Sequence, residues 1–153
     1  MYDRILVPVD GSPTANAGLE EAIKLAQLTH GRLRIVHAVE QLRYLSEVDG
    51  LSGGWTSELV GALTQAGRDL LAQAQARAVA AGVTVETHLY DGFVERLAEL
   101  VVAEAQAWQA DLIVLGTHGR RGVRRAMLGS DAEQVLRIAS VPVLLVRCPE
   151  PDR

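Results

Sequence analysis

Residues 112–130 read LIVLGTHGRRGVRRAMLGS, an apolar run followed by a loop rich in glycine and arginine. The apolar run, residues 112–115, is typical of a strand that a parallel sheet buries on both faces. Such runs alternate along the chain with longer segments of helical periodicity. We expect strands at 5–9, 33–39, 83–90, 112–115 and 141–146, and helices at 13–29, 56–81, 93–108 and 131–139. This βαβαβαβαβ order predicts an α/β fold, an open five-stranded parallel sheet with helices on both faces and right-handed crossovers.

Short sequence signals mark the ends of several of these elements. Ser12 is expected to cap the first helix, because Pro13 fits the first helical position. Ser130 and Glu133 have the spacing of a capping box, which accounts for Ser130 with or without a ligand. Pro142 lacks an N–H, which either puts the last strand at a sheet edge or confines the proline to the first residue of that strand. The expected buried face of the second helix consists of Leu59, Leu63, Ala66, Leu70 and Ala74.

The loop that follows residues 112–115 has the composition of an anion site. Glycine lets the backbone approach an anion closely or turn with positive φ, and the loop carries Gly116, Gly119 and Gly129. The helix expected after Ser130 offers N–H groups and a favourable dipole. Guanidinium groups match phosphate oxygens, and they come from Arg120, Arg121, Arg124 and Arg125. A charge run is more often a solvated face, but four arginines without an interleaved carboxylate favour anions. The loop predicts phosphate binding, with a nucleotide as the expected ligand.

Length and composition limit the remaining possibilities. The 153 residues suffice for one domain, expected at residues 1–148, with a short tail at 149–153. A net charge of -4 argues against a nucleic-acid partner. The single cysteine, Cys148, permits no internal disulfide, and no apolar stretch approaches the ~20 residues of a membrane span. We therefore expect a cytoplasmic protein that contacts neither nucleic acid nor membrane.

Three of the expected strands end in segments with polar or glycine-rich chemistry. Val9-Asp10-Gly11-Ser12 follows the first strand, His37-Ala38-Val39-Glu40 follows the second, and residues 116–130 follow the fourth. Ligands of open α/β sheets bind beyond the carboxyl ends of the strands, where the strand order reverses. If the order is 3-2-1-4-5, the first and fourth strands are neighbours, and the acidic turn and the glycine loop meet at one crevice.

The chain strongly resembles the universal stress protein family, in particular the branch whose signature G-x2-G-x9-G-[ST] marks ATP binders. The matching residues are Gly116, Gly119, Gly129 and Ser130. The opening ILVPVDGS at 5–12 and the ending VPVLLVR at 141–147 are also similar to the family, so the resemblance covers nearly the whole chain. It implies an adenine nucleotide alpha hydrolase-like fold with strand order 3-2-1-4-5.

The resemblance also implies which residues surround the adenosine. Pro8, Val9 and Asp10 would border it, with Asp10 near the ribose or a metal-bound water. Ala38 and Leu115 would contact the adenine base.

The resemblance also implies that the glycine loop binds the phosphates. Gly116 and Gly119 would let the backbone pass close to the ribose and the phosphates. Gly129 and Ser130 would present N–H groups and a hydroxyl to the terminal phosphates, and positive charge would come from Arg120 and Arg121.

One position departs from the family pattern. The family usually has Val or Thr after the Gly-Ser pair, and this chain has Asp131. A carboxylate there suits the helix dipole but repels a γ-phosphate, which leaves ATP, ADP and AMP all open as ligands. Mg²⁺ would be held mainly through the phosphates, because no carboxylate cage is visible in the sequence.

The expected function is a nucleotide-dependent regulatory or stress-response module with little or no hydrolysis. The sequence lacks a Gly-x4-Gly-Lys-[Ser/Thr] loop, and its only lysine, Lys24, falls in the first expected helix. Two alternatives stay open. One is a slow ATP hydrolase that uses His118 or Asp131, and the other is a protein-interaction module without nucleotide. Flavin binding is also possible, although flavodoxin-like sheets favour Ser/Thr-rich phosphate loops after the first strand.

The last strand suggests an oligomer. Val143 to Val146 is short, apolar and expected at a sheet edge, where unpaired backbone groups can bind another strand. We expect a homodimer through this strand, as the family resemblance also implies, and an unknown downstream protein partner.

Overall fold

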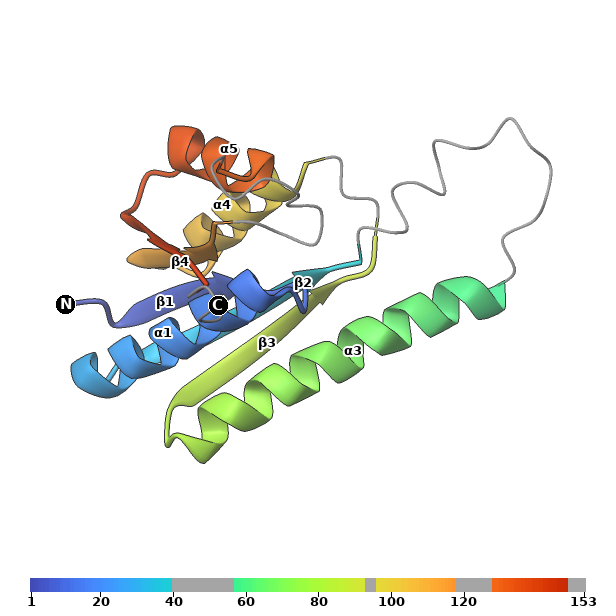
Figure 1. Ribbon diagram of the computed structural model, residues 1–153, viewed down its shortest axis with the longest axis horizontal. Coiled ribbons are helices and arrows are strands. Elements are labelled where there is room, and N and C mark those ends of the chain that lie inside the picture. Colours follow the sequence, from blue (N-terminus) through green and yellow to red (C-terminus); the bar gives the residue numbers. More distant parts are fainter. Residues whose placement is uncertain (40–56, 93–95, 118–127, 149–153) are drawn as a thin grey trace, which may run out of the picture.

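The computed structural model describes residues 1–39, 57–92, 96–117 and 128–148. Strands and helices alternate along the chain as the sequence predicts (Figure 1). The strands are β1 (Arg4–Pro8), β2 (Arg32–Ala38), β3 (Thr84–Tyr90), β4 (Leu112–Gly116) and β5 (Val143–Val146). The helices are α1 (Pro13–Thr29), α3 (Ser57–Ala80), α4 (Leu97–Ala107) and α5 (Ser130–Ile138). None of the described helices is both long and apolar enough to cross a membrane.

The five strands form one parallel sheet in the order β3-β2-β1-β4-β5. This confirms the predicted fold class and strand order. The chain begins in the middle of the sheet, adds β2 and β3 on one side, and then crosses to add β4 and β5 on the other. The order therefore reverses between β1 and β4, which is the place where open α/β sheets bind ligands.

Helices cover both faces of the sheet, with α1 and α3 on one face and α4 and α5 on the other (Figure 1). Successive strand residues point to opposite faces, so the central strands supply two cores. Ile5 and Val7 of β1 pack in the core under α1 and α3, whereas Leu6 packs in the core under α4 and α5. β4 alternates in the same way. Burial on both faces explains why these strands are continuous apolar runs.

The first helix begins and ends at the predicted residues, Pro13 and Thr29. The Ser12 side chain accepts a hydrogen bond from the Ala15 N–H at 3.2 Å, and Pro13 is the first helical residue. The chain leaves α1 through His30, whose φ is 56°. The left-handed residue that ends this helix is therefore a histidine and not Gly31.

The predicted buried face of α3 is partly wrong. Ala74 is buried and Leu70 is half-buried, but Leu59 and Ala66 are exposed. The fully buried positions follow a different stripe, namely Gly67, Leu71, Ala74 and Ala78. The reason is the contact at Gly67, where an added Cβ would lie 3.0 Å from side chains of both His37 and Leu89. The helix meets the sheet through its small residue.

The last strand, β5, lies at an edge of the sheet. Pro142 comes one residue before it, and its carbonyl accepts a hydrogen bond from the Ile113 N–H at 3.0 Å. The proline thus contributes the one backbone group that it has.

Trp108 is the C-cap of α4 and packs half-buried against the core under α4 and α5. Phe93, expected in the same helix, lies outside the described residues.

Candidate functional site

The candidate site lies at the carboxyl ends of β1 and β4, where the strand order reverses and open α/β sheets form a ligand-binding crevice. β1 and β4 are hydrogen-bonded neighbours, with Ile5 opposite Leu112 and Leu6 opposite Ile113. The chain leaves β1 for α1 on one face of the sheet and leaves β4 toward α5 on the other. The turn after β1 and the segment after β4 therefore begin side by side, as the predicted strand order requires.

The turn after β1 is fixed by its own hydrogen bonds. The Asp10 carboxylate accepts the Ser12 N–H at 2.8 Å, and Gly11 between them has φ of 79°. Ser12 in turn caps α1, and its carbonyl accepts the Asn16 N–H at 2.9 Å. A side chain at Gly11 would be strained by the positive φ. The turn holds Asp10 half-exposed just beyond the carboxyl end of β1.

Gly116 ends β4 in very close contact with the first turn of α1. A Cβ added at Gly116 would lie 2.5 Å from the Thr14 carbonyl carbon and 2.8 Å from the Ala15 nitrogen. One turn further along α1, a Cβ on Gly18 would lie 3.2 Å from the Gly116 nitrogen. Only glycine permits this approach, which brings the N-terminus of α1 against the start of the glycine loop.

The two described ends of the glycine loop are tied together. The Gly129 N–H donates to the Thr117 carbonyl at 2.8 Å, and the Thr117 N–H donates to the Val146 carbonyl at 3.0 Å. These bonds hold the N-terminus of α5 at the carboxyl end of β4. The crevice therefore has the first turn of one helix on each face of the sheet, and both turns favour an anion.

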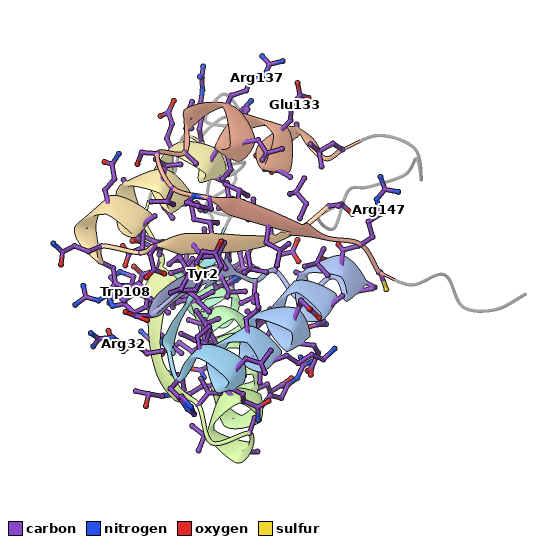
Figure 2. All side chains as sticks on the ribbon, turned by 90° about the vertical axis from the view of Figure 1, so that its left-hand side faces the viewer. Tyr2, Arg32, Trp108, Glu133, Arg137 and Arg147 are labelled. Carbon is purple, nitrogen blue, oxygen red and sulfur yellow. The ribbon has the colours of Figure 1, made fainter. Side chains whose placement is uncertain are left out.

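The predicted capping box at the start of α5 is wrong. Gly129 is the N-cap, Ser130 is the first helical residue, and within the described part of the chain no side chain caps the helix. The Glu133 N–H donates to the Gly129 carbonyl at 2.9 Å, and the Glu133 carboxylate pairs with Arg137 at 2.6 Å. Figure 2 shows Glu133 and Arg137 together on the outer side of α5, away from the sheet. Because its side chain does not cap the helix, Ser130 lies exposed in the first turn, followed by exposed Asp131.

An apolar surface lies beside the polar turn. Leu115 packs in the core under α4 and α5, and strand alternation puts Pro8 and Ala38 on that same face of the sheet. Ala38 and Leu115 are buried, and Pro8 is half-buried. Val9 points to the opposite face, in the core under α1 and α3. Three of the predicted base-contacting or adenosine-bordering residues thus share one face.

His37 supports this edge of the sheet from the other face. Its ring is buried and its Nδ1 lies 2.7 Å from the Val9 carbonyl oxygen, so Nδ1–H donates to that oxygen. The bond fixes the residue before Asp10. His37 therefore has a structural role at this edge of the sheet.

The structure describes nine of the twelve predicted site residues and brings them to one edge of the sheet. Gly119, Arg120 and Arg121 lie outside the described residues, as do Arg124, Arg125 and His118. Within the described residues, no group of three or more His, Cys, Asp and Glu side chains is arranged to hold a metal ion.

Sequence reasoning missed two threonines at the crevice. Thr117 is buried and joins the loop ends, and Thr14 supplies the backbone that Gly116 contacts. A signal existed for Thr117, since it lies inside the glycine signature. Thr14 has no comparable signal, because its role depends on a contact with a residue about a hundred positions away.

The model of the universal stress protein family matches residues 1–147 of this chain. The chain belongs to the universal stress protein family. A universal stress protein of Methanocaldococcus jannaschii is 31% identical over 153 residues, which cover 99% of this chain and 86% of that protein. The fold, with sheet order 3-2-1-4-5, is the adenine nucleotide alpha hydrolase-like fold of this family.

Solved structures of the family agree with this assignment. A protein of the universal stress protein family from Burkholderia pseudomallei is 35% identical to this chain, with a TM-score of 0.72. The match covers 95% of this chain and 96% of that chain. A universal stress protein from Archaeoglobus fulgidus, solved in complex with dAMP, is 26% identical, with a TM-score of 0.66. That match covers 95% of this chain and 98% of the other.

Proposed function

We propose that this universal stress protein binds an adenine nucleotide in the crevice between β1 and β4 and acts as a nucleotide-dependent regulatory module in a stress response. ATP is the expected ligand, with ADP and AMP as alternatives. The observation that carries the proposal is the contact of Gly116 with the first turn of α1, which joins the glycine loop to a helix N-terminus. The relative solved with dAMP supports an adenine nucleotide as the ligand class.

The adenosine would lie along the apolar face formed by Pro8, Ala38 and Leu115. The Asp10 carboxylate, half-exposed at the crevice, is suited to accept hydrogen bonds from ribose hydroxyls. Val9 would border the adenosine only through its backbone, because its carbonyl oxygen accepts the hydrogen bond from His37 that fixes the start of the turn.

The phosphates would extend from Gly116 toward Gly129 and Ser130, with Gly119, Arg120 and Arg121 contributing from the loop. The exposed hydroxyl of Ser130 and the dipole of α5 favour negative charge at that end. Mg²⁺ would be held mainly through the phosphates, because the described residues offer at most single carboxylates such as Asp10 and Asp131. Bound there, it would neutralise phosphate charge.

We infer that hydrolysis is slow or absent. Lys24, the only lysine, pairs with Glu21 on the exposed surface of α1 and is not available to cradle phosphates. A turnover near the ~1 per second of good enzymes would contradict this inference. A slow hydrolase using His118 or Asp131 is the second candidate. It predicts that alanine at either position abolishes phosphate release while nucleotide binding persists.

The first experiment is native mass spectrometry of the purified protein before and after addition of ATP with Mg²⁺. One adenine nucleotide per chain would support the proposal, and the mass of the adduct would distinguish ATP from ADP and AMP. A protein that stays bare at saturating ATP would overturn the nucleotide proposal and favour a protein-interaction module.

We also propose that the protein forms a homodimer through β5. Leu144 and Val146 pack partly against one core and Val143 and Leu145 against the other, and every β5 residue is only half-buried. Such an edge strand would gain burial and backbone hydrogen bonds from an antiparallel copy. The same mass spectrum reports this state.

A further inference from the structure

A charged cluster lies between α4 and the β2–β3 side of the sheet. Glu104 is a buried residue of α4, and one of its carboxylate oxygens lies 2.5 Å from the Arg34 Nε atom. The other oxygen of Glu104 accepts the Tyr90 hydroxyl. Arg34 also donates to Glu86 at 2.9 Å, and its second amino nitrogen lies 3.3 Å from the His88 Nδ1. Three side chains of β3, namely Glu86, His88 and Tyr90, thus converge on an ion pair between β2 and α4, in which Glu104 is buried and Arg34 is half-buried.

This cluster holds the Tyr90 ring in one orientation. Burial, the hydrogen bond to Glu104 and the charge of Glu104 raise the pKa of Tyr90 above its usual value, and Arg34 opposes them only in part. The hydroxyl therefore stays protonated and donates. The ring also stacks on the His88 imidazole, with centroids 4.4 Å apart. His88 precedes Tyr90 on the strand, so the ring face opposite His88 is directed toward the carboxyl edge of the sheet.

Tyr90 ends β3 directly beside the apolar face of the candidate site. Ala38 and Tyr90 are partners in the β2–β3 register, and the Val39 N–H donates to the Tyr90 carbonyl at 2.9 Å. Paired residues of neighbouring parallel strands point to the same face of a sheet. The phenol ring therefore lies next to Ala38, on the face that also carries Pro8 and Leu115.

We propose that Tyr90 is a specificity-determining residue of the nucleotide site, where its ring packs against the base, and that Glu104 and Arg34 are positioning residues that hold the ring there. This inference rests on the proposed function, since it requires an adenine nucleotide in the crevice. An aromatic face held at the edge of an apolar surface is suited to a nucleobase, because every base has a π-face and gains from stacking. The ribose and phosphates lie on the other side of Ala38, toward β1 and β4.

The test compares two ligands that differ by the base alone, AMP and ribose 5-phosphate, by isothermal titration. Tyr90→Phe keeps the ring, and Tyr90→Leu removes it while retaining apolar volume. Tyr2→Leu is the matched control, since Tyr2 lies at the amino-terminal end of the sheet, opposite the site (Figure 2). Circular dichroism verifies that each variant is folded.

We expect Tyr90→Leu to lower the affinity for AMP by about tenfold and to change the affinity for ribose 5-phosphate by no more than about twofold. Tyr2→Leu should bind AMP within about twofold of the unmodified protein. Tyr90→Phe keeps the ring but loses the hydroxyl bond to Glu104, so its affinity for AMP should fall by about threefold, between the other two variants. A merely structural role of Tyr90 would weaken both ligands together, and that result overturns the inference. Unchanged AMP affinity in folded Tyr90→Leu also overturns it and leaves the proposed function intact. Failure of the unmodified protein to bind AMP, ADP or ATP overturns both.

Discussion

Replacing Gly116 by alanine tests the contact between β4 and α1 on which the site depends. The new Cβ would lie 2.5 Å from the Thr14 carbonyl carbon, 2.6 Å from the Thr14 oxygen and 2.8 Å from the Ala15 nitrogen. Carbon atoms in contact are normally about 3.5 Å apart or more, so the first turn of α1 must move by about 1 Å. All three atoms belong to the backbone, so no side-chain rotation relieves the overlap. We expect Gly116→Ala to lower the free energy of unfolding by about 1–3 kcal/mol.

The assay is urea unfolding followed by circular dichroism, with Gly61→Ala as the matched control. Gly61 lies within α3, and a Cβ added there meets nothing within 4 Å. Alanine is the better helix former, so the control should raise stability by about 0.5–1 kcal/mol. If Gly116→Ala unfolds at the same urea concentration as the unmodified protein while the control behaves as expected, the close approach at Gly116 is refuted.

Three further predictions follow from the site and the sheet edge. Glu104→Leu leaves the Arg34 guanidinium without its buried partner and should cost about 2–4 kcal/mol in urea unfolding; a neutral result would mean that Glu86 suffices as the counter-charge. Asp131→Asn removes a charge near the proposed γ-phosphate, so it should raise the affinity for ATP about threefold and leave the affinity for AMP unchanged. Equal gains in affinity for both nucleotides would contradict this reasoning. Leu144→Asp should convert the proposed dimer to a monomer in sedimentation velocity, and a dimer that persists in this variant would exclude β5 as the interface.

The sequence alone determined the order and type of the elements. Strands buried on both faces must be apolar throughout, and residues 5–7 and 112–115 satisfy this requirement without reference to their neighbours. The N-cap at Ser12 is equally local, because the bond joins residues three positions apart. The family was predicted chiefly from the spacing of Gly116, Gly119, Gly129 and Ser130. The match of the family model over residues 1–147 confirms that prediction.

The sequence was wrong where a group from a distant part of the chain decides the local geometry. Ser130 has the spacing of a capping residue, but the Gly129 N–H bonds to the Thr117 carbonyl, and this bond makes Gly129 the N-cap. The leucines of α3 mark an apolar stripe, but α3 meets the sheet through Gly67, where an added Cβ would lie 3.0 Å from the His37 side chain. Periodicity measures apolar character and does not measure how much room the side chains of the sheet leave for a helix.

Only the tertiary structure decided which further residues lie beside the predicted site. Gly116 meets Thr14, and Tyr90 lies beside Ala38, because parallel strands from distant parts of the chain end at one edge of the sheet. Glu104 reads as a surface residue of an amphipathic helix, and Arg34 reads as a polar position in a strand. Their pairing, about seventy positions apart, arises only when α4 is folded onto β2. Local sequence specifies what each segment becomes, whereas contacts between segments depend on strand order and helix packing, which no single segment contains.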